Sequence, residues 1–259
     1  MNLQFTKDPN FIKNNIPYFG SEKAGDEFDE TDVISWTEGG HFARRWQEKG
    51  QTNELRNNVW MALCKQAAEL NLPIIELACG PNMGLLPDIY AINPNIYATA
   101  TDACPMVVEH WNQFIRVNAP TANINFASFD AINMPLASNS VDVITSFVAF
   151  GSLRYAGADQ LSGIKEAYRV LKPGGYIFTV EMEFEDMAVI QQVFDKWGQE
   201  NWFKDNKLTW RKRFEQSGFV VEQENFMQRR QAQDWELGDV AASFGMEIWS
   251  TSNAYVLQK

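Results

Sequence analysis

The 259-residue chain contains few of the residues that build disulfide frameworks and metal centres. Its three cysteines, Cys64, Cys79 and Cys104, form no CxxC pair, which argues against a disulfide framework and against a zinc site. No apolar run approaches the roughly 18 residues that a membrane helix requires. The first residues also lack the basic start, apolar core and small-residue cleavage site of a secretion signal. We therefore expect a soluble, cytoplasmic protein with no metal site and no membrane contact.

Basic residues are scarce as well. The sequence has 22 lysines and arginines against 33 aspartates and glutamates, a formal net charge of −11. Such a charge repels nucleic-acid phosphates and anionic lipid headgroups. Two short basic runs, at 211–213 and 229–230, are interpreted as solvated surface rather than as phosphate-binding sites. Nucleic acid is therefore not an expected partner, and a small-molecule substrate is.

Helical and strand patterns alternate along most of the chain. Apolar residues recur at intervals of three and four from 53 to 70, which predicts an amphipathic helix, and a second such stripe runs from 161 to 171. Short apolar runs between these helical patterns predict strands, and this alternation favours a parallel sheet flanked by helices. The predicted strands begin at 74 and cover 96–101, 124–129, 141–147 and 176–180, followed by a helical stretch at 187–214 and strands at 219–227 and 254–258.

The segment LPIIELACGPNMGLL, residues 72–86, joins a buried strand to a turn of small residues. Ala78, Gly80 and Gly84 allow the backbone to turn tightly against a nucleoside-type ligand at the end of the strand. Their spacing does not match GxGxxG, which argues against a dinucleotide pyrophosphate. Asp102 follows the next strand about twenty residues later, the separation at which a carboxylate binds the two ribose hydroxyls. The segment therefore predicts a nucleoside-containing cofactor.

Four segments in this order resemble the class I S-adenosylmethionine-dependent methyltransferases, and the resemblance covers 71–184. They are ELACGPNMG from Glu76, TDACP with Asp102, FDAINMPLASNSVDVI with Asp130, and EAYRVLKPGGYIFTVE. The resemblance implies a Rossmann-like α/β fold with a seven-stranded, mostly parallel sheet, helices on both faces and an antiparallel C-terminal strand pair. It also implies S-adenosylmethionine as the cofactor and in-line transfer of its methyl group to a small organic acceptor. Ala78 stands where the family often has glycine.

The resemblance assigns cofactor contacts to individual residues. It implies that Glu76 and the backbone near Ala78 hold the methionyl portion, Asp102 the ribose, and Asp130 the adenine amine. Met106 is interpreted as packing beside the adenosine or, equally, as a core helix residue. Cys79 is interpreted as a small residue that packs in the turn rather than as a nucleophile. The complete expected set is Glu76, Ala78, Cys79, Gly80, Asp102, Ala103, Met106, Asp130, Ala131 and Phe147.

The acceptor site is less well defined by the sequence. Residues 1–52 are expected to form a lid over the cofactor domain at 53–259, and the catalytic candidates are His41, Tyr155 and Glu183. A histidine suits proton removal near neutral pH, but a surface role for His41 is favoured over a catalytic one. For Glu183 the alternative is a solvated carboxylate among Glu181, Glu185 and Asp186.

The type of acceptor stays open among oxygen, nitrogen and carbon nucleophiles. The segment SFVAFGSLRY after the fourth predicted strand lacks the DPPY or NPPY motif with which relatives hold the planar amine of a base or of glutamine. Three hypotheses remain: an active methyltransferase, a non-catalytic protein that binds the cofactor and serves a partner, and a nicotinamide-dependent oxidoreductase. The glycine spacing disfavours the third. A homodimer is an open alternative to a monomer.

Overall fold

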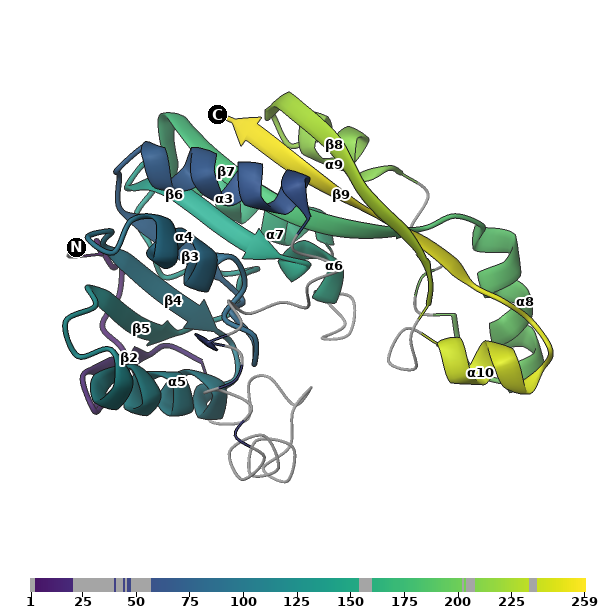
Figure 1. The fold of residues 1–259 in the computed structure, drawn as a ribbon, viewed down its shortest axis with the longest axis horizontal. Helices are drawn as coiled ribbons and strands as arrows, with labels where there is room; N and C mark the ends of the chain where they lie inside the picture. The colour runs from purple at the N-terminus through teal and green to yellow at the C-terminus, as the bar shows by residue number, and fades with distance from the viewer. Residues whose placement is uncertain are drawn as a thin grey trace.

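The computed structural model describes residues 3–20, 40, 44, 46–47, 57–153, 160–201, 203, 208–232 and 237–259. Within them, one sheet runs in the order β1-β2-β5-β4-β3-β6-β7-β9-β8 (Figure 1). Its strands are β1 (Phe11–Lys13), β2 (Ile16–Tyr18), β3 (Ile74–Leu77), β4 (Ala98–Asp102), β5 (Ile124–Ser128), β6 (Val141–Phe147), β7 (Leu171–Phe184), β8 (Val220–Gln231) and β9 (Trp249–Gln258). The helices are α3 (Asn58–Glu69), α4 (Leu86–Ile92), α5 (Pro105–Asn118), α6 (Ala149–Ser152), α7 (Gln160–Val170), α8 (Met187–Trp197), α9 (Trp210–Gln216) and α10 (Gly238–Ser243).

The centre of the sheet is parallel, and its C-terminal edge is antiparallel. β3 pairs in parallel with β4 on one side and β6 on the other, and β9 runs antiparallel to both β7 and β8. This confirms the expected Rossmann-like class. The strand order reverses direction at β3, so the crevice outside the carboxyl ends of β3, β4 and β6 is the place where such sheets bind ligands.

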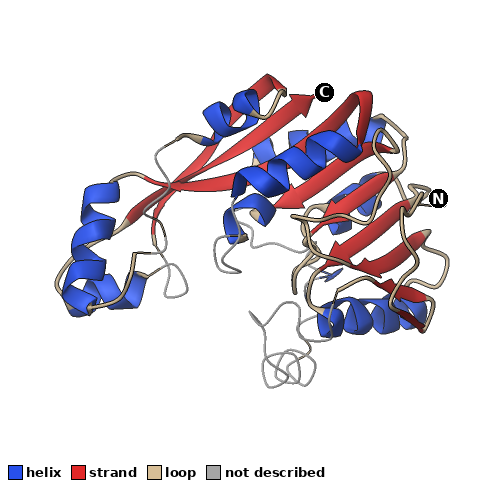
Figure 2. Ribbon diagram, turned by 180° about the vertical axis from the view of Figure 1, so that it is seen from behind, coloured by secondary structure: helices blue, strands red, loops and turns tan. Residues whose placement is uncertain are grey.

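Helices cover both faces of the sheet, and each face has its own hydrophobic core (Figure 2). One core packs α3, α4 and α5 against the sheet through side chains such as Trp60, Ile89 and Trp111. The other packs α6, α7 and α9 through side chains such as Phe150 and Phe214. The strands in the middle are buried on both faces, as parallel strands between two helical layers are.

The N-terminal residues extend the sheet beyond the seven expected strands. β1 and β2 form a hairpin whose turn residues Asn14 and Asn15 have φ angles of 53° and 63°, as a tight hairpin turn requires. β2 then pairs in parallel with β5, at Tyr18 and Ser128. Most of the predicted lid lies outside the described residues. In the part of the predicted lid that follows β2, Trp46 is described, and its ring centroid lies 5.4 Å from that of Tyr90 on α4.

The C-terminal strands extend past the parallel part of the sheet as a long ribbon that carries α8 and α10 at its far end (Figure 1). β7 and β9 stay paired from Tyr176 and Gln258 to Phe184 and Ser250. A third hydrophobic core lies between α8 and α10 and includes Phe194. We call residues 184–203 and 237–249, as far as they are described, the distal arm. None of the described helices is long and apolar enough to cross a membrane.

Candidate cofactor and acceptor site

The loop after β3 is held in an unusual backbone conformation. Ala78, Gly80, Met83 and Gly84 have φ angles of 49°, 53°, 62° and 54°, all in the left-handed region. A residue with a Cβ costs roughly 1–2 kcal/mol there, and such strain persists where the surrounding structure over-determines it, typically at ligand sites. The positive φ at Ala78 also gives a physical reason why glycine suits this position.

Gly80 and Gly84 serve the loop in different ways. A Cβ built on Gly84 would lie 1.8 Å from Oε1 of Glu76, so no larger residue fits there without a shift. A Cβ built on Gly80 would meet only the Ala78 carbonyl oxygen, at 4.0 Å, and would otherwise project into open space. Gly84 therefore permits close packing inside the protein, whereas Gly80 leaves its backbone accessible to a ligand.

Glu76 lies beneath the loop rather than at the open edge of the sheet. Its side chain is fully buried, and Oε2 accepts a 2.6 Å hydrogen bond from the Thr145 hydroxyl on β6, while Oε1 has no hydrogen-bond partner. Burial raises the pKa of Glu76 to about 8, against smaller lowering effects of Thr145 and of the Leu85 and Leu86 amides. The described geometry gives Glu76 a role in supporting the loop, and its contact with the cofactor stays a prediction.

Asp102 connects the loop to the end of β4. Its Oδ2 accepts the backbone N–H of Gly80 at 2.8 Å, and its Oδ1 accepts that of Cys104 at 2.9 Å. The Gly80 carbonyl in turn accepts a 2.9 Å bond from the indole of Trp111 on α5. Burial raises the pKa of Asp102, while the amides of Cys104, Gly80 and Ala103 lower it. Two backbone amides, one from each of the two expected cofactor segments, thus meet at one carboxylate.

The geometry of Asp102 is compatible with a ribose diol. A carboxylate offers about four acceptor sites, and the two backbone amides occupy two of them. The Gly80 N–H donates to this carboxylate, and a Cβ built on Gly80 would meet open space. These residues therefore fit the nucleoside part of the implied cofactor.

Asp130 and Ala131 follow the neighbouring strand at the same edge of the sheet. The N–H of Phe129 donates to the Asp102 carbonyl at 3.1 Å, so the chain ends of β4 and β5 are in contact. Oδ1 of Asp130 accepts the N–H of Ile132 at 3.0 Å and shapes the turn that contains Ala131. The structure thus brings Asp130 and Ala131 beside Asp102, as the sequence predicts.

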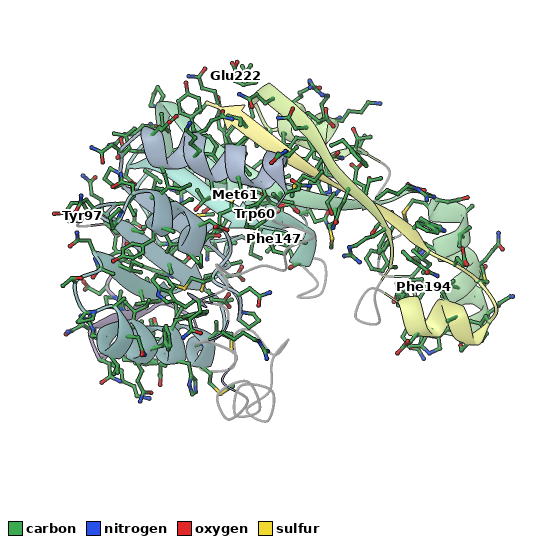
Figure 3. The ribbon with its side chains drawn as sticks, viewed as in Figure 1. Trp60, Met61, Tyr97, Phe147, Phe194 and Glu222 are labelled. Atoms are coloured by element: carbon green, nitrogen blue, oxygen red, sulfur yellow. The ribbon has the colours of Figure 1, made fainter. Side chains whose placement is uncertain are left out.

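Three other expected cofactor residues pack mainly against the protein. The rings of Phe147, at the end of β6, and Trp60 on α3 meet edge to face with centroids 5.6 Å apart (Figure 3). Met106 is partly buried against the first core. Cys79 is buried, and its backbone N–H donates to the Thr101 carbonyl at 2.7 Å. Burial is the main cause that raises the pKa of its thiol, and the negative charge of Asp102 is the second. Packing is therefore the evident role of Cys79.

Of the three catalytic candidates, His41 and Tyr155 lie outside the described residues. Glu183 lies on β7, where Oε1 accepts the backbone N–H of Trp210 at 2.5 Å. Burial raises the pKa of Glu183, and the Trp210 amide lowers it. This places the carboxylate against the start of α9, and a contact with an acceptor stays a prediction. No group of three metal-ligating side chains occurs within the described part of the chain.

The alternative interpretation of Glu183 placed it in a solvated acidic run that includes Glu181, but the structure buries Glu181. Glu181 is fully buried and accepts backbone amides from α6. The available signal was its position directly after the apolar run 176–180, which continues the same buried strand. Trp111 and Thr145 were also missed, because their hydrogen bonds join segments far apart in the sequence and no local pattern marks them.

Comparison with known proteins agrees with this geometry. Residues 75–179, which include the loop after β3 and the ends of β4, β5 and β6, match the family described as "Methyltransferase domain". A putative methyltransferase from Bacillus halodurans has the same fold, with a TM-score of 0.55 at 19% identity over 77% of this chain and 98% of that one. The match of this segment and the shared fold both support a class I S-adenosylmethionine-dependent methyltransferase.

Two curated relatives are more specific in name. The chain is 30% identical over 124 residues to the ubiquinone/menaquinone biosynthesis C-methyltransferase UbiE of Agrobacterium fabrum, which is 48% of this chain and 46% of that protein. It is 32% identical over 101 residues to UbiE of Rhizobium meliloti, 39% of this chain and 38% of that protein. The chain thus spans less than half the length of these relatives.

Proposed function

We propose that the protein transfers the methyl group of S-adenosylmethionine to a small organic acceptor by in-line displacement. The single observation that carries the proposal is the Asp102 carboxylate, which accepts the backbone N–H groups of Gly80 and Cys104 and keeps acceptor capacity for the two hydroxyls of a ribose. The match of 75–179 to a methyltransferase domain supports the same activity.

Different residues at the edge of the sheet bind different parts of the cofactor. Asp102 binds the two ribose hydroxyls, and Asp130 and the backbone of Ala131 hold the adenine. The loop of residues 78–84 supplies backbone groups to the amino-acid end of the cofactor. The cofactor contributes an electrophilic methyl group on a sulfonium, so the protein's task is to align an acceptor with it rather than to form a covalent intermediate.

The acceptor side of the site lies next to the end of β6. Phe147 is the last residue of this strand, and β6 is the neighbour of β3. The curated relatives are named C-methyltransferases, so organic acceptors that are methylated on carbon are the first class to test. Acceptors that are methylated on oxygen or nitrogen are to be tested as well. An apolar ring such as that of Phe147 suits the flat face of an aromatic acceptor.

The test is a screen of small acceptors with S-adenosylmethionine that carries a labelled methyl group, read as a gain of one methyl mass in the acceptor. We expect a gain with at least one phenolic or enolic compound and loss of this activity in Asp102→Ala. Tight binding of S-adenosylhomocysteine without any methyl transfer across these classes would contradict the proposal and favour a binding protein that serves a partner.

A further inference from the structure

Glu181 on β7 is a buried carboxyl group with several backbone and hydroxyl donors. Its Oε2 accepts the N–H of Gly151 at 3.0 Å, and its Oε1 accepts the N–H of Phe150 at 3.3 Å. The Thr179 hydroxyl donates to Oε1 at 3.1 Å and lies 2.7 Å from the Ser146 hydroxyl. The side chain is therefore fixed by contacts with α6 and with Thr179 of its own strand, whose hydroxyl in turn meets Ser146 on β6.

Gly151 is also held through the next peptide group, by its carbonyl oxygen. The carbonyl of Gly151 accepts a 3.3 Å bond from the side chain of Gln160, at the start of α7. Gln160 accepts a hydrogen bond from the buried guanidinium of Arg213 on α9, and this guanidinium lies 4.4 Å from the centre of the Trp210 ring. A Cβ on Gly151 would lie 3.1 Å from Oε2 of Glu181, so the peptide is closely packed.

α6 begins immediately beyond the acceptor end of β6. Val148, which follows Phe147, has a φ of 56°, and its N–H donates to the Val180 carbonyl at 2.7 Å. The chain therefore turns sharply where it leaves the sheet, next to the end of β3 and to Val180 within β7. Glu181 follows Val180 directly, so its side chain reaches the turn at the next residues, Phe150 and Gly151.

We propose that Glu181 is a positioning residue for methyl transfer: by binding the Phe150 and Gly151 amides, it fixes α6 as the acceptor-facing wall of the site. This inference rests on the proposed function. Glu181 itself touches neither cofactor nor acceptor. It acts through α6, which begins two residues after Phe147, and a shift of about 1 Å in a positioning element is enough to lower turnover strongly.

The substitution Glu181→Gln separates the geometry of this contact from its volume. Each oxygen of a carboxyl group accepts a hydrogen bond, whereas the side-chain nitrogen of glutamine only donates. One of the two α6 amides therefore loses its acceptor while the packing volume stays nearly unchanged. Glu185→Gln is the matched control, because Glu185 lies four residues further along, is partly exposed and pairs with Arg229 instead.

Three measurements on the full chain test the proposal. In Glu181→Gln, we expect hydrogen exchange of the Phe150 and Gly151 amides to be at least tenfold faster, by NMR. We expect kcat for an acceptor found by the methyl-mass screen to be at least tenfold lower, with KM for S-adenosylmethionine within twofold of wild type. Calorimetric affinity for S-adenosylhomocysteine should also stay within twofold, and Glu185→Gln should match wild type throughout.

Two results would overturn the inference. Unchanged exchange of the α6 amides would show that Glu181 does not hold the turn. An unchanged kcat, or a loss of kcat matched by an equal loss of S-adenosylhomocysteine affinity, would show a general structural role instead. Failure of the proposed function is recognised separately, because then the wild-type protein itself does not bind S-adenosylhomocysteine.

Discussion

The carboxylate of Asp102 accepts the backbone N–H of Gly80 at 2.8 Å and thereby joins the loop after β3 to the end of β4. These two residues lie 22 positions apart in the sequence. The contact fixes the Gly80 backbone against Asp102, so the two segments expected to bind the cofactor are joined in the protein alone.

Gly80 and Gly84 form a matched pair for mutation. Their φ angles are 53° and 54°, so alanine at either position costs about the same backbone strain, roughly 1–2 kcal/mol. A Cβ at Gly84 also collides with Glu76, whereas one at Gly80 enters the space assigned to the cofactor. We expect Gly84→Ala to lower the free energy of unfolding by about a further 1–3 kcal/mol, which is the usual cost of overpacking a core.

Urea unfolding and calorimetric titration with S-adenosylhomocysteine check this prediction. Gly80→Ala should lose the smaller amount of stability yet bind at least tenfold more weakly than wild type. Gly174→Ala is the control for strain alone, because Gly174 has a φ of 77° and a Cβ there meets nothing within 4 Å. Equal stability losses at Gly80 and Gly84 would count against the packing argument.

Two buried carboxyl groups give the folding stability a defined pH dependence. Burial raises the pKa of Glu76 and of Glu181 from 4.5 to about 8 in the folded protein. Between these values the native state keeps protons that the unfolded chain releases, so the free energy of unfolding decreases as pH rises. The contribution of each group is complete below about pH 4.5 and is lost as pH passes about 8.

Urea unfolding between pH 5 and pH 9 measures this slope. Glu76→Gln and Glu181→Gln should each reduce the downward slope over this window, whatever their effect on stability at a single pH. Stability curves of the variants that run parallel to the wild-type curve across the whole range would contradict the assignment.

The distal arm has its own core, so damage there should stay local. Phe194 is fully buried between α8 and the rest of the arm, where its ring packs against Phe203 and Trp197 (Figure 3). Replacing a buried phenylalanine by alanine costs about 3–5 kcal/mol. We expect Phe194→Ala to open the arm to proteolysis while S-adenosylhomocysteine binding stays within twofold of wild type.

Phe214→Ala is the matched comparison in the second core. In this core its ring contacts those of Phe150, Trp210 and Tyr255. Replacing Phe214 by alanine should therefore destabilise the whole protein. Limited proteolysis followed by mass spectrometry distinguishes the two patterns. Global cleavage of Phe194→Ala, with loss of ligand binding, would show that the arm and the cofactor domain unfold together.

Local patterns in the sequence predict the parallel half of the sheet well. The strand expected at 141–147 is β6 in full, and the predicted order of strand, turn and acidic residue places Asp102 and Asp130 at one edge. Periodic burial is the reason, because strands covered on both faces have near-continuous apolar sequences.

The elements that were missed depend on contacts between distant segments. β9 begins at Trp249 rather than at the predicted residue 254. The sequence did not reveal its first half, WSTSN, because this half is polar and forms a strand through pairing with β7 and β8. β1 and β2 have three residues each, too few for a periodic signal. Glu181 is an acidic residue inside a strand, and hydrogen bonds from the α6 amides and from Thr179 accompany its burial. His41 and Tyr155 stay predictions.

Titration calorimetry with S-adenosylhomocysteine tests the central claim most directly, on wild type, Asp102→Asn and the control Asp142→Asn. Asp142 pairs with Lys172 at the opposite end of β6, away from the loop after β3. We expect micromolar binding by wild type and by Asp142→Asn, and at least tenfold weaker binding by Asp102→Asn. No binding by wild type, or equal binding by all three proteins, would contradict the assignment of Asp102 to the cofactor ribose.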